Sequence, residues 1–322
     1  MCGLAILARM RTVGLGLSVA AVATLATPAT ALAQQNNGGN GNGQPAQNGG
    51  DMAATDADLK DVTVYGEAES GDQPVGPYNQ PAWTARQQRF PTTRAYVLPP
   101  GVFELETFAN YSETEGDGAG PEWEFQQELK IGLPYRTQLD LYYVAPRPAG
   151  GEIESQGYKV ELRHAFADWG ELPLNPTAYV EYEAPFEGDE GSGVIEGKLL
   201  LADTLAPKTH FAANLIYEQY LQEDKIEYGV SSGISYTLVE NTFSIGAEGE
   251  IIKEDAGSEQ KVEALLGPSF EYRPTNNTSL RFAPLFGLNN EAPDISAFMV
   301  FGIGFGPGES GEYGGPAGAE MR

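Results

Sequence analysis

Carboxylates are the most numerous side chains in this sequence that could take part in chemistry, as acids, bases or metal ligands. The 322 residues include 45 Asp and Glu against 19 Lys and Arg, a net charge of -26, with two histidines and one cysteine. Any metal site would therefore use oxygen ligands and suit Ca²⁺ or Mg²⁺. The acidic runs Glu113–Asp117 and Glu187–Glu190 could bind such ions only loosely, because they lack the spacing of a calcium-binding loop. We therefore interpret them as solvated loops. So acidic a chain repels nucleic acid, and no nucleic-acid partner is expected.

The two histidines give little support for catalysis. His164 falls on the apolar side of its segment and is followed by Ala165-Phe166-Ala167-Asp168, which contains no serine or cysteine to act as a nucleophile. His210 lies beside Lys208 at the start of another segment. Both are predicted to be interfacial residues. No catalytic site, cofactor or metal is predicted, and the protein is not expected to be an enzyme.

Many charged residues recur at every second position and alternate with apolar ones, as where Glu104 and Glu106 alternate with Phe103 and Leu105. This period of two is typical of strands whose faces meet different surroundings. The polar face is predicted to line a water-filled interior. Its charged residues are Glu104, Glu106, Glu124, Glu128, Lys130, Asp140, Glu161, Arg163, Glu181, Glu183, Glu196, Lys198, Glu218, Glu248, Glu250, Glu263, Glu271 and Arg281.

The elements that must position these residues are twelve alternating segments between residues 102 and 306. Each is about ten residues long, as membrane-spanning strands are, and their even number suits a bacterial barrel. The predicted fold class is all-β, a single antiparallel transmembrane β-barrel of about 12 strands, with 10 to 14 as the range.

The connections between the segments fall into two alternating sets. One set is mostly short and turn-like, at residues 134–136, 168–176, 204–209, 239–242 and 274–278. The other is often longer, acidic and glycine-rich, at residues 113–121, 146–156, 187–193, 222–225, 254–259 and 289–294. Outer-membrane barrels have short periplasmic turns and longer outer loops, so this alternation favours that architecture.

A soluble β-sandwich or barrel would also alternate, with its apolar face inside. Twelve hairpin-linked strands in a soluble barrel would, however, enclose an apolar cavity too wide for side chains to fill. In a bilayer the apolar face meets lipid and the charged face meets water. We therefore predict a membrane barrel.

The N-terminal residues are typical of an export signal. Arg9 and Arg11 precede an apolar run over residues 13–25, which leads to Ala31-Leu32-Ala33. The pattern predicts a signal peptide over residues 1–33, cleaved after Ala33. The apolar run is shorter than the ~20 residues that a spanning helix needs.

Three further segments flank the predicted strands. Residues 34–76 are dominated by Gln, Asn, Gly, Asp and Ala, which predicts a disordered linker. Residues 77–101 contain Trp83, Arg89, Arg94 and several prolines and form an irregular periplasmic lead-in to the barrel. The favoured interpretation packs this segment on the periplasmic end of the barrel; the alternative places it in the lumen, where its arginines would meet carboxylates. Residues 307–322 are predicted to be a flexible C-terminal tail.

Residues 77–306 resemble the outer-membrane proteins grouped with the MetA pathway of phenol degradation. The resemblance depends on Arg94-Ala95-Tyr96-Val97-Leu98-Pro99-Pro100-Gly101, Gln126-Gln127-Glu128-Leu129-Lys130-Ile131-Gly132-Leu133 and Glu227-Tyr228-Gly229-Val230-Ser231-Ser232-Gly233. It implies an uptake channel for small molecules, including aromatic ones.

The sequence thus predicts a porin-like channel of a Gram-negative outer membrane for passive transport of small solutes. Its carboxylate-rich wall would favour cations. The expected partners are outer-membrane lipid, a small-molecule solute and the barrel-assembly machinery. Two alternatives remain, a structural or adhesive surface barrel with a blocked lumen, and an enzyme acting on lipid, in which His164 would serve.

Overall fold

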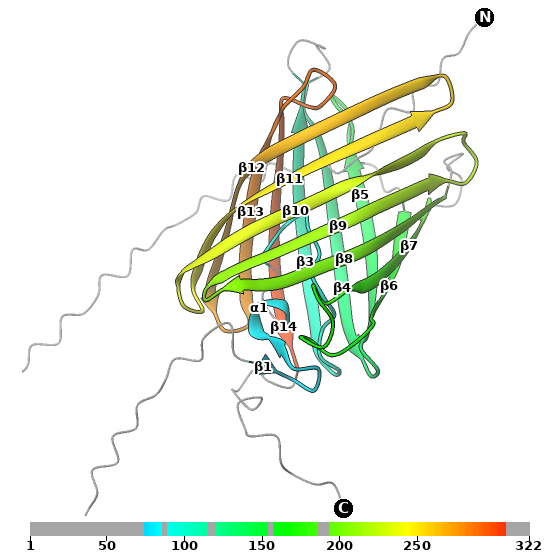
Figure 1. The fold of residues 1–322 in the computed structure, drawn as a ribbon. Coiled ribbons are helices and arrows are strands. Elements are labelled where there is room, and N and C mark those ends of the chain that lie inside the picture. The colour runs from blue at the N-terminus through cyan, green and yellow to red at the C-terminus, as the bar shows by residue number, and fades with distance from the viewer. Residues whose placement is uncertain (1–73, 86–88, 115–119, 154–156, 186–192, 307–322) are drawn as a thin grey trace, which may run out of the picture. The chain divides into compact units, whose positions relative to one another are not determined.

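Twelve antiparallel strands close into a barrel in the computed structural model (Figure 1). The structure describes residues 74–85, 89–114, 120–153, 157–185 and 193–306. Neighbours in sequence are neighbours in the wall, and the last strand pairs with the first. The strands are β3 (Phe103–Glu113), β4 (Glu122–Leu133), β5 (Thr137–Arg147), β6 (Gly157–Ala165), β7 (Thr177–Pro185), β8 (Val194–Ala206), β9 (Thr209–Tyr220), β10 (Ile226–Val239), β11 (Phe243–Ala256), β12 (Glu259–Thr275), β13 (Thr278–Gly287) and β14 (Ile295–Phe305). The predicted all-β fold with a twelve-stranded antiparallel barrel is confirmed.

Several predicted features lie outside the described residues. These are the signal peptide with its cleavage site at Ala33, the linker as far as residue 73 and the tail over residues 307–322. The acidic run Glu187–Glu190 and residues 115–119 of the other acidic loop lie outside them as well.

The period of two in the sequence becomes two faces of the wall. In β6, Val160 and Leu162 are 46% and 49% exposed, whereas Glu161 and Arg163 between and beside them are fully buried. The same alternation runs along β3, β4 and β12, so the outer face is apolar and the inner face is polar. This is the arrangement expected of a barrel that has hydrocarbon outside.

The two ends of the barrel differ in their connections. The end that carries the turns at 134–136, 207–208, 240–242 and 276–277 is called the short-turn end here, and the opposite end the loop end. At the first of these turns Tyr135 and Arg136 both adopt positive φ angles, 62° and 56°, as a tight hairpin of matching twist requires. In the part of the chain that the structure describes, no helix has the length and hydropathy needed to cross a membrane.

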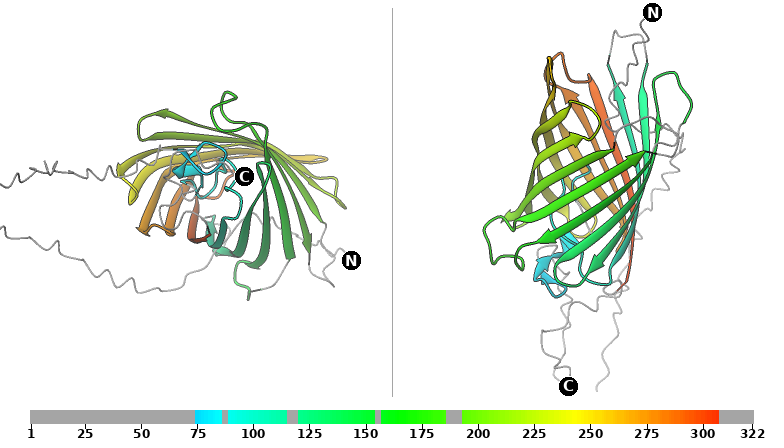
Figure 2. Two further views of the ribbon diagram at one scale, coloured as in Figure 1. Left: turned by 90° about the horizontal axis from the view of Figure 1, so that it is seen from below. Right: turned by 90° about the vertical axis from the view of Figure 1, so that its right-hand side faces the viewer.

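The chain before the barrel is ordered from residue 74. Pro74–Val75 (β1) pairs with Gln80–Pro81 (β2), and Ala82–Ala85 (α1) follows at the short-turn end. Residues 89–101 then run inside the ring of strands before β3 begins (Figure 2, left). Residues 74–101 as the structure describes them are called the lead-in below. Its buried side chains make the main apolar clusters inside the barrel, around Trp83 and Phe90 and around Tyr96 and Val97.

Candidate functional site

The interior wall carries a continuous row of charged side chains, one on each of eight neighbouring strands. Each residue of the row is the register partner of the next one. From β3 to β10 the row is Glu104, Lys130, Asp140, Glu161, Glu181, Glu196, Glu218 and Glu227. Glu104 is the second residue of β3 at the short-turn end, whereas Glu227 is the second residue of β10 at the loop end. Because barrel strands are tilted, a row perpendicular to them climbs along the barrel axis. The carboxylates therefore follow the wall from one end of the barrel to the other.

Basic side chains accompany this row near the short-turn end. Lys130 Nζ lies 2.7 Å from Glu106 Oε2 and 3.5 Å from Glu104 Oε2. Arg281 of β13 also pairs with Glu106. All four side chains are almost fully buried. Burying such charges is tolerable only when they are paired, as these are.

Toward the loop end the row is less enclosed. Lys159 Nζ lies 2.8 Å from Glu183 Oε2 and 3.5 Å from Glu181 Oε1. Lys198 Nζ lies 2.8 Å from Glu196 Oε2, and both side chains are partly exposed. Here the ionised groups retain contact with solvent.

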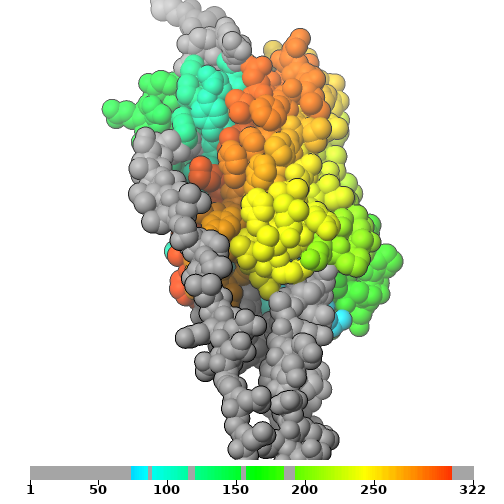
Figure 3. All heavy atoms as spheres, turned by 90° about the vertical axis from the view of Figure 1, so that its left-hand side faces the viewer, coloured from blue at the N-terminus to red at the C-terminus, as the bar shows by residue number. Residues whose placement is uncertain are grey.

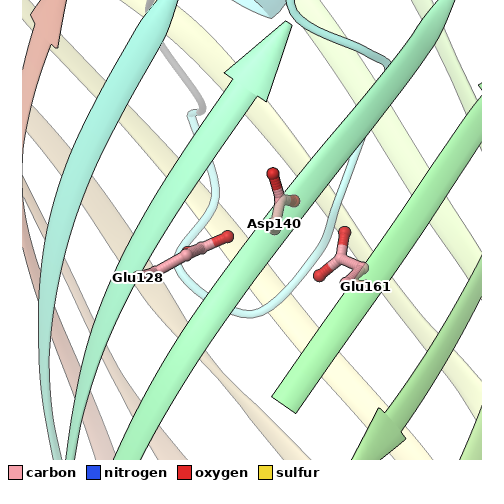
Figure 4. A group of neighbouring side chains, drawn as sticks. All are labelled: Glu128, Asp140 and Glu161. Atoms are coloured by element: carbon pink, nitrogen blue, oxygen red, sulfur yellow. The ribbon is translucent and has the colours of Figure 1, made fainter. Parts of the chain in front are cut away.

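Two carboxylates of the row, Asp140 and Glu161, converge with Glu128, which lies beside the row on β4. Oxygen atoms of Glu128, Asp140 and Glu161 lie within 4.8 Å of one another, on β4, β5 and β6 (Figure 4). Arg163 Nη2 lies 3.1 Å from Asp140 Oδ2, and Arg163 also binds Glu161. Arg94 Nη2 lies 3.5 Å from Glu128 Oε2. The two guanidinium groups supply the positive charge that a metal ion would bring, so the geometry is that of an ion-pair network.

Arg94 belongs to the lead-in, which passes beside these carboxylates in Figure 4. Its Nη2 also donates to the Tyr142 hydroxyl, at 3.2 Å, and that hydroxyl donates to Glu161 Oε2, at 2.5 Å. The Arg94 backbone N–H donates to Asn214 Oδ1 at 2.8 Å, and Asn214 Nδ2 donates back to the Arg94 carbonyl at 2.7 Å. The lead-in is thereby bound to β4, β5 and β9 at one point.

A second set of contacts joins the lead-in to the later strands. Arg89 Nη1 lies 3.2 Å from Glu271 Oε2 of β12 and also bonds Ser244 of β11. The Thr92 hydroxyl and backbone N–H both donate to Glu248 Oε2, at 2.5 Å and 3.0 Å. These contacts agree with the alternative interpretation of this segment, in which its arginines meet inward carboxylates.

Aromatic rings hold the beginning of the lead-in. Trp83 is fully buried, stacks on His210 with the ring centroids 4.9 Å apart, and meets Trp169 edge-on at 5.8 Å. Its Nε1 donates to Thr204 Oγ1 at 3.1 Å. The prediction that His210 is interfacial is therefore wrong: it is fully buried on the inner face, where Trp83 covers it. The position of His210 at the start of a strand did not indicate that Trp83 would cover it.

The end of the lead-in is fixed by backbone contacts. The Leu98 N–H donates to Gln138 Oε1 at 2.7 Å, and Gly132 lies so close to Pro99 that a Cβ there would overlap the Pro99 carbonyl oxygen. The Tyr96 hydroxyl donates to the Ala167 carbonyl at 2.7 Å. Burial, with the nearby Asp168 carboxylate, raises the pKa of Tyr96 well above its ordinary value, so the hydroxyl keeps its proton and remains a donor.

The predicted polar-face residues divide into two groups by burial. Buried on the inner face are Glu104, Glu106, Glu124, Glu128, Lys130, Asp140, Glu161, Arg163, Glu181, Glu248, Glu271 and Arg281. Partly exposed are Glu183, Glu196, Lys198, Glu218, Glu250 and Glu263. The list omitted Glu227, which completes the row, and the lead-in residues Arg89 and Arg94. His164 lies on the outer face, with Nδ1 3.2 Å from Thr137 Oγ1.

The sequence and the fold were compared with those of known proteins. No curated protein sequence matches the chain. Among solved structures, an outer membrane channel from Pseudomonas putida F1 superposes with a TM-score of 0.52 at 12% identity, over 65% of this chain and 97% of that chain. The NanC porin superposes less well, with a TM-score of 0.45 at 10% identity, over 63% of this chain and 98% of that one. At these identities the first likeness establishes the fold.

The family model described as "Putative MetA-pathway of phenol degradation" matches residues 174–301, from the turn before β7 into β14. Of the three segments on which the resemblance was based, Glu227–Gly233 lies inside the match, while the other two lie before it. The predicted resemblance to this family is thus confirmed, with the family's sequence pattern present from β7 into β14.

Proposed function

We propose that the protein is an outer-membrane channel for passive transport of small solutes, and that it prefers cations. The observation that carries the proposal is the row of seven carboxylates and one lysine that follows the inner wall between the two ends. Fixed negative charge along a water-filled lumen lowers the electrostatic energy of a cation and raises that of an anion. The exposed apolar outer face supports placement in a bilayer.

The lead-in would set the width and charge of the narrowest part of the path. Arg89 and Arg94 bring two positive charges to the carboxylates at the lead-in, whereas partly exposed Glu196 and Glu218 lie closer to the loop end. A small hydrated cation is therefore attracted at the loop end and meets its main barrier at the lead-in. Outer-membrane lipid is the surrounding partner, and the barrel-assembly machinery would insert the protein after signal cleavage at Ala33.

The test is electrical. The purified full-length chain is added to planar bilayers, and single-channel steps and the reversal potential in a KCl gradient are measured. We expect discrete steps and a reversal potential with the sign of cation preference. Absence of reproducible steps would overturn the channel proposal, and preference for anions would overturn the role of the carboxylate row. N-terminal sequencing of the exported protein, expected to begin at Gln34, tests the cleavage site.

A second candidate, a surface barrel with a blocked lumen, is favoured by one observation, the dense binding of the lead-in to three carboxylates and to Asn214. The same recordings decide between the two, because a permanently bound lead-in gives a silent protein. Comparison of the wild type with Arg94→Gln adds to the test. Steps that appear only in Arg94→Gln would favour the blocked barrel.

An enzyme acting on lipid is the least supported alternative, since the partner of His164 is the hydroxyl of Thr137 on the exposed face. We propose no enzymatic activity. Lipid hydrolysis by the purified protein that His164→Ala abolishes would reverse this conclusion.

A further inference from the structure

The wall of the barrel has a break in its backbone hydrogen bonding between β12 and β13. Both strands are described along their whole length, and register pairs occur at Leu265–Gly287 and Leu266–Phe286, and again from Phe270–Phe282 onward. No pair is formed at the positions between them. By the register of the flanking pairs, Pro268 and Pro284 face each other at the centre of this break. Proline has no N–H, so neither residue can donate to the carbonyl of the other.

Two opposed prolines are exceptional in the interior of a membrane barrel. Proline in a sheet is normally confined to edges and bulges, and a bilayer offers no water to satisfy a carbonyl that lacks a donor. The strands nevertheless lie close together here, because a Cβ at Gly267 would overlap the Pro284 carbonyl oxygen. At the two prolines the wall is therefore closed by close packing of the strands and not by N–H···O bonds between them.

The inner surface beside the break is apolar, in contrast to the charged wall elsewhere. Leu265, Ala283, Leu285 and Ala292 form a buried cluster, and Phe298 packs against it. The outer surface beside the break is apolar too, since Leu266 and Phe286 are about half exposed on that face, at 50% and 48%. An apolar molecule would therefore find favourable contacts on both sides of this break in the wall.

The break lies on the loop-end side of the lead-in. Along β12 the chain runs toward the short-turn end, and Glu271, which binds Arg89, comes three residues after Pro268. Above the break only two register pairs remain before β13 ends. Beyond them the closure depends on loop contacts, in which Leu288 N–H donates to the Ala264 carbonyl at 2.8 Å and Asn289 Nδ2 donates to the Val262 carbonyl at 2.7 Å.

We propose that the break between β12 and β13 is a lateral exit, through which small apolar solutes pass from the loop-end half of the lumen into the hydrocarbon of the outer membrane. Figure 3 views the barrel from the side that carries these strands. The lead-in narrows the axial path below this level. Separation of β12 from β13 toward the loop end requires loss of only two register pairs and the loop contacts. The exit goes beyond the proposed axial channel, because it serves a different class of solute by a different route.

A reversible cross-link across the break tests the proposal. By the register of the flanking pairs, Ser269 lies opposite Ala283, and both side chains are buried on the inner surface beside the two prolines, so this position is chosen for a disulfide. The variant Ser269→Cys/Ala283→Cys is produced in intact Gram-negative cells, and the rate of uptake of N-phenyl-1-naphthylamine is followed by fluorescence with and without dithiothreitol. The control is Ser112→Cys/Ser296→Cys, an inward pair on the fully hydrogen-bonded β3–β14 junction.

We expect uptake to fall to the level of cells without the protein when Ser269→Cys/Ala283→Cys is oxidised, and to return on reduction. The control pair should not change it. The proposal is overturned if the wild-type protein gives no uptake above those cells, if the cross-link leaves uptake unchanged, or if the control pair abolishes it equally. Planar-bilayer conductance of the same variants reports the axial channel separately and should be unchanged by oxidation, so the two proposals can fail independently.

Restoring the missing donors provides a second test that needs no disulfide. Pro268→Ala/Pro284→Ala can form both absent hydrogen bonds and should lose dye uptake while keeping conductance. Pro146→Ala, in β5 near the loop end opposite Glu124, is the matched control and should keep both. Undiminished dye uptake by the double proline variant, after a gel-shift assay has shown that it is folded, would overturn the proposal.

Discussion

The Nη1 atom of Arg89 lies 3.2 Å from Oε2 of Glu271, in an ion pair of which each side chain is only 2% exposed. The two residues are 182 positions apart in the chain. A segment that precedes the barrel is thus bound to one of its last strands, and the strength of this connection can be measured.

Arg89→Ala should reduce the free energy of unfolding by about 3–5 kcal/mol, because it leaves the Glu271 carboxylate buried without its partner. Unfolding by urea in lipid vesicles measures this. Arg136→Ala is the control, since its ion pair with Asp168 is about one-third exposed and should contribute at most about 1 kcal/mol. Equal losses in the two variants would contradict the importance of the buried pair.

Gly132→Ala should destabilise the barrel by about 1–3 kcal/mol, since the added methyl group overlaps the Pro99 carbonyl and displaces the end of the lead-in. Gly197→Ala provides the comparison, because a Cβ there meets no atom within 4 Å. Urea unfolding should separate the two variants, and a Gly132→Ala protein as stable as the wild type would mean that the lead-in does not lie where the structure places it.

Trp83→Ala removes the stack on His210 and the hydrogen bond to Thr204, and should cost about 3–5 kcal/mol. Tyr135→Ala, at a turn residue that is 85% exposed, should leave stability almost unchanged. Trypsin digestion offers a second measurement, in which the lead-in of Trp83→Ala should be cut faster. Protection equal to that of the wild type would refute the anchoring role of the indole.

Glu196→Gln/Glu218→Gln removes two negative charges from the loop-end part of the carboxylate row and should shift the reversal potential in a KCl gradient toward zero. Glu240→Gln removes a charge at a short turn, where Glu240 pairs with Lys208, and serves as the control. An unchanged reversal potential in the double variant would show that ions do not pass along this part of the wall.

The sequence predicted the barrel well because alternation is a local property. Glu161 and Arg163 face inward wherever their strand lies, provided that Val160 and Leu162 face lipid. The partners of the lead-in could not be predicted in this way. Arg89 and Arg94 lie in a segment without period, and nothing local indicates that a residue 182 positions away completes the pair.

Strand content was predictable even where it violated propensity. Pro268 and Pro284 are unfavourable residues for a central strand, yet the apolar alternation around them predicted strands correctly. What local pattern could not predict was that the two prolines would coincide, because that depends on the register between β12 and β13. His210 was misjudged for a related reason, since its burial depends on Trp83, which lies 127 positions earlier in the printed sequence.

The position of the lead-in also constrains the order of assembly. Residues 89–101 are made before any barrel strand, yet they bind Ser244, Glu248 and Glu271 on strands made late. These contacts can form only when β11 and β12 are also in place. The segment that is made first is therefore among the last to acquire its partners.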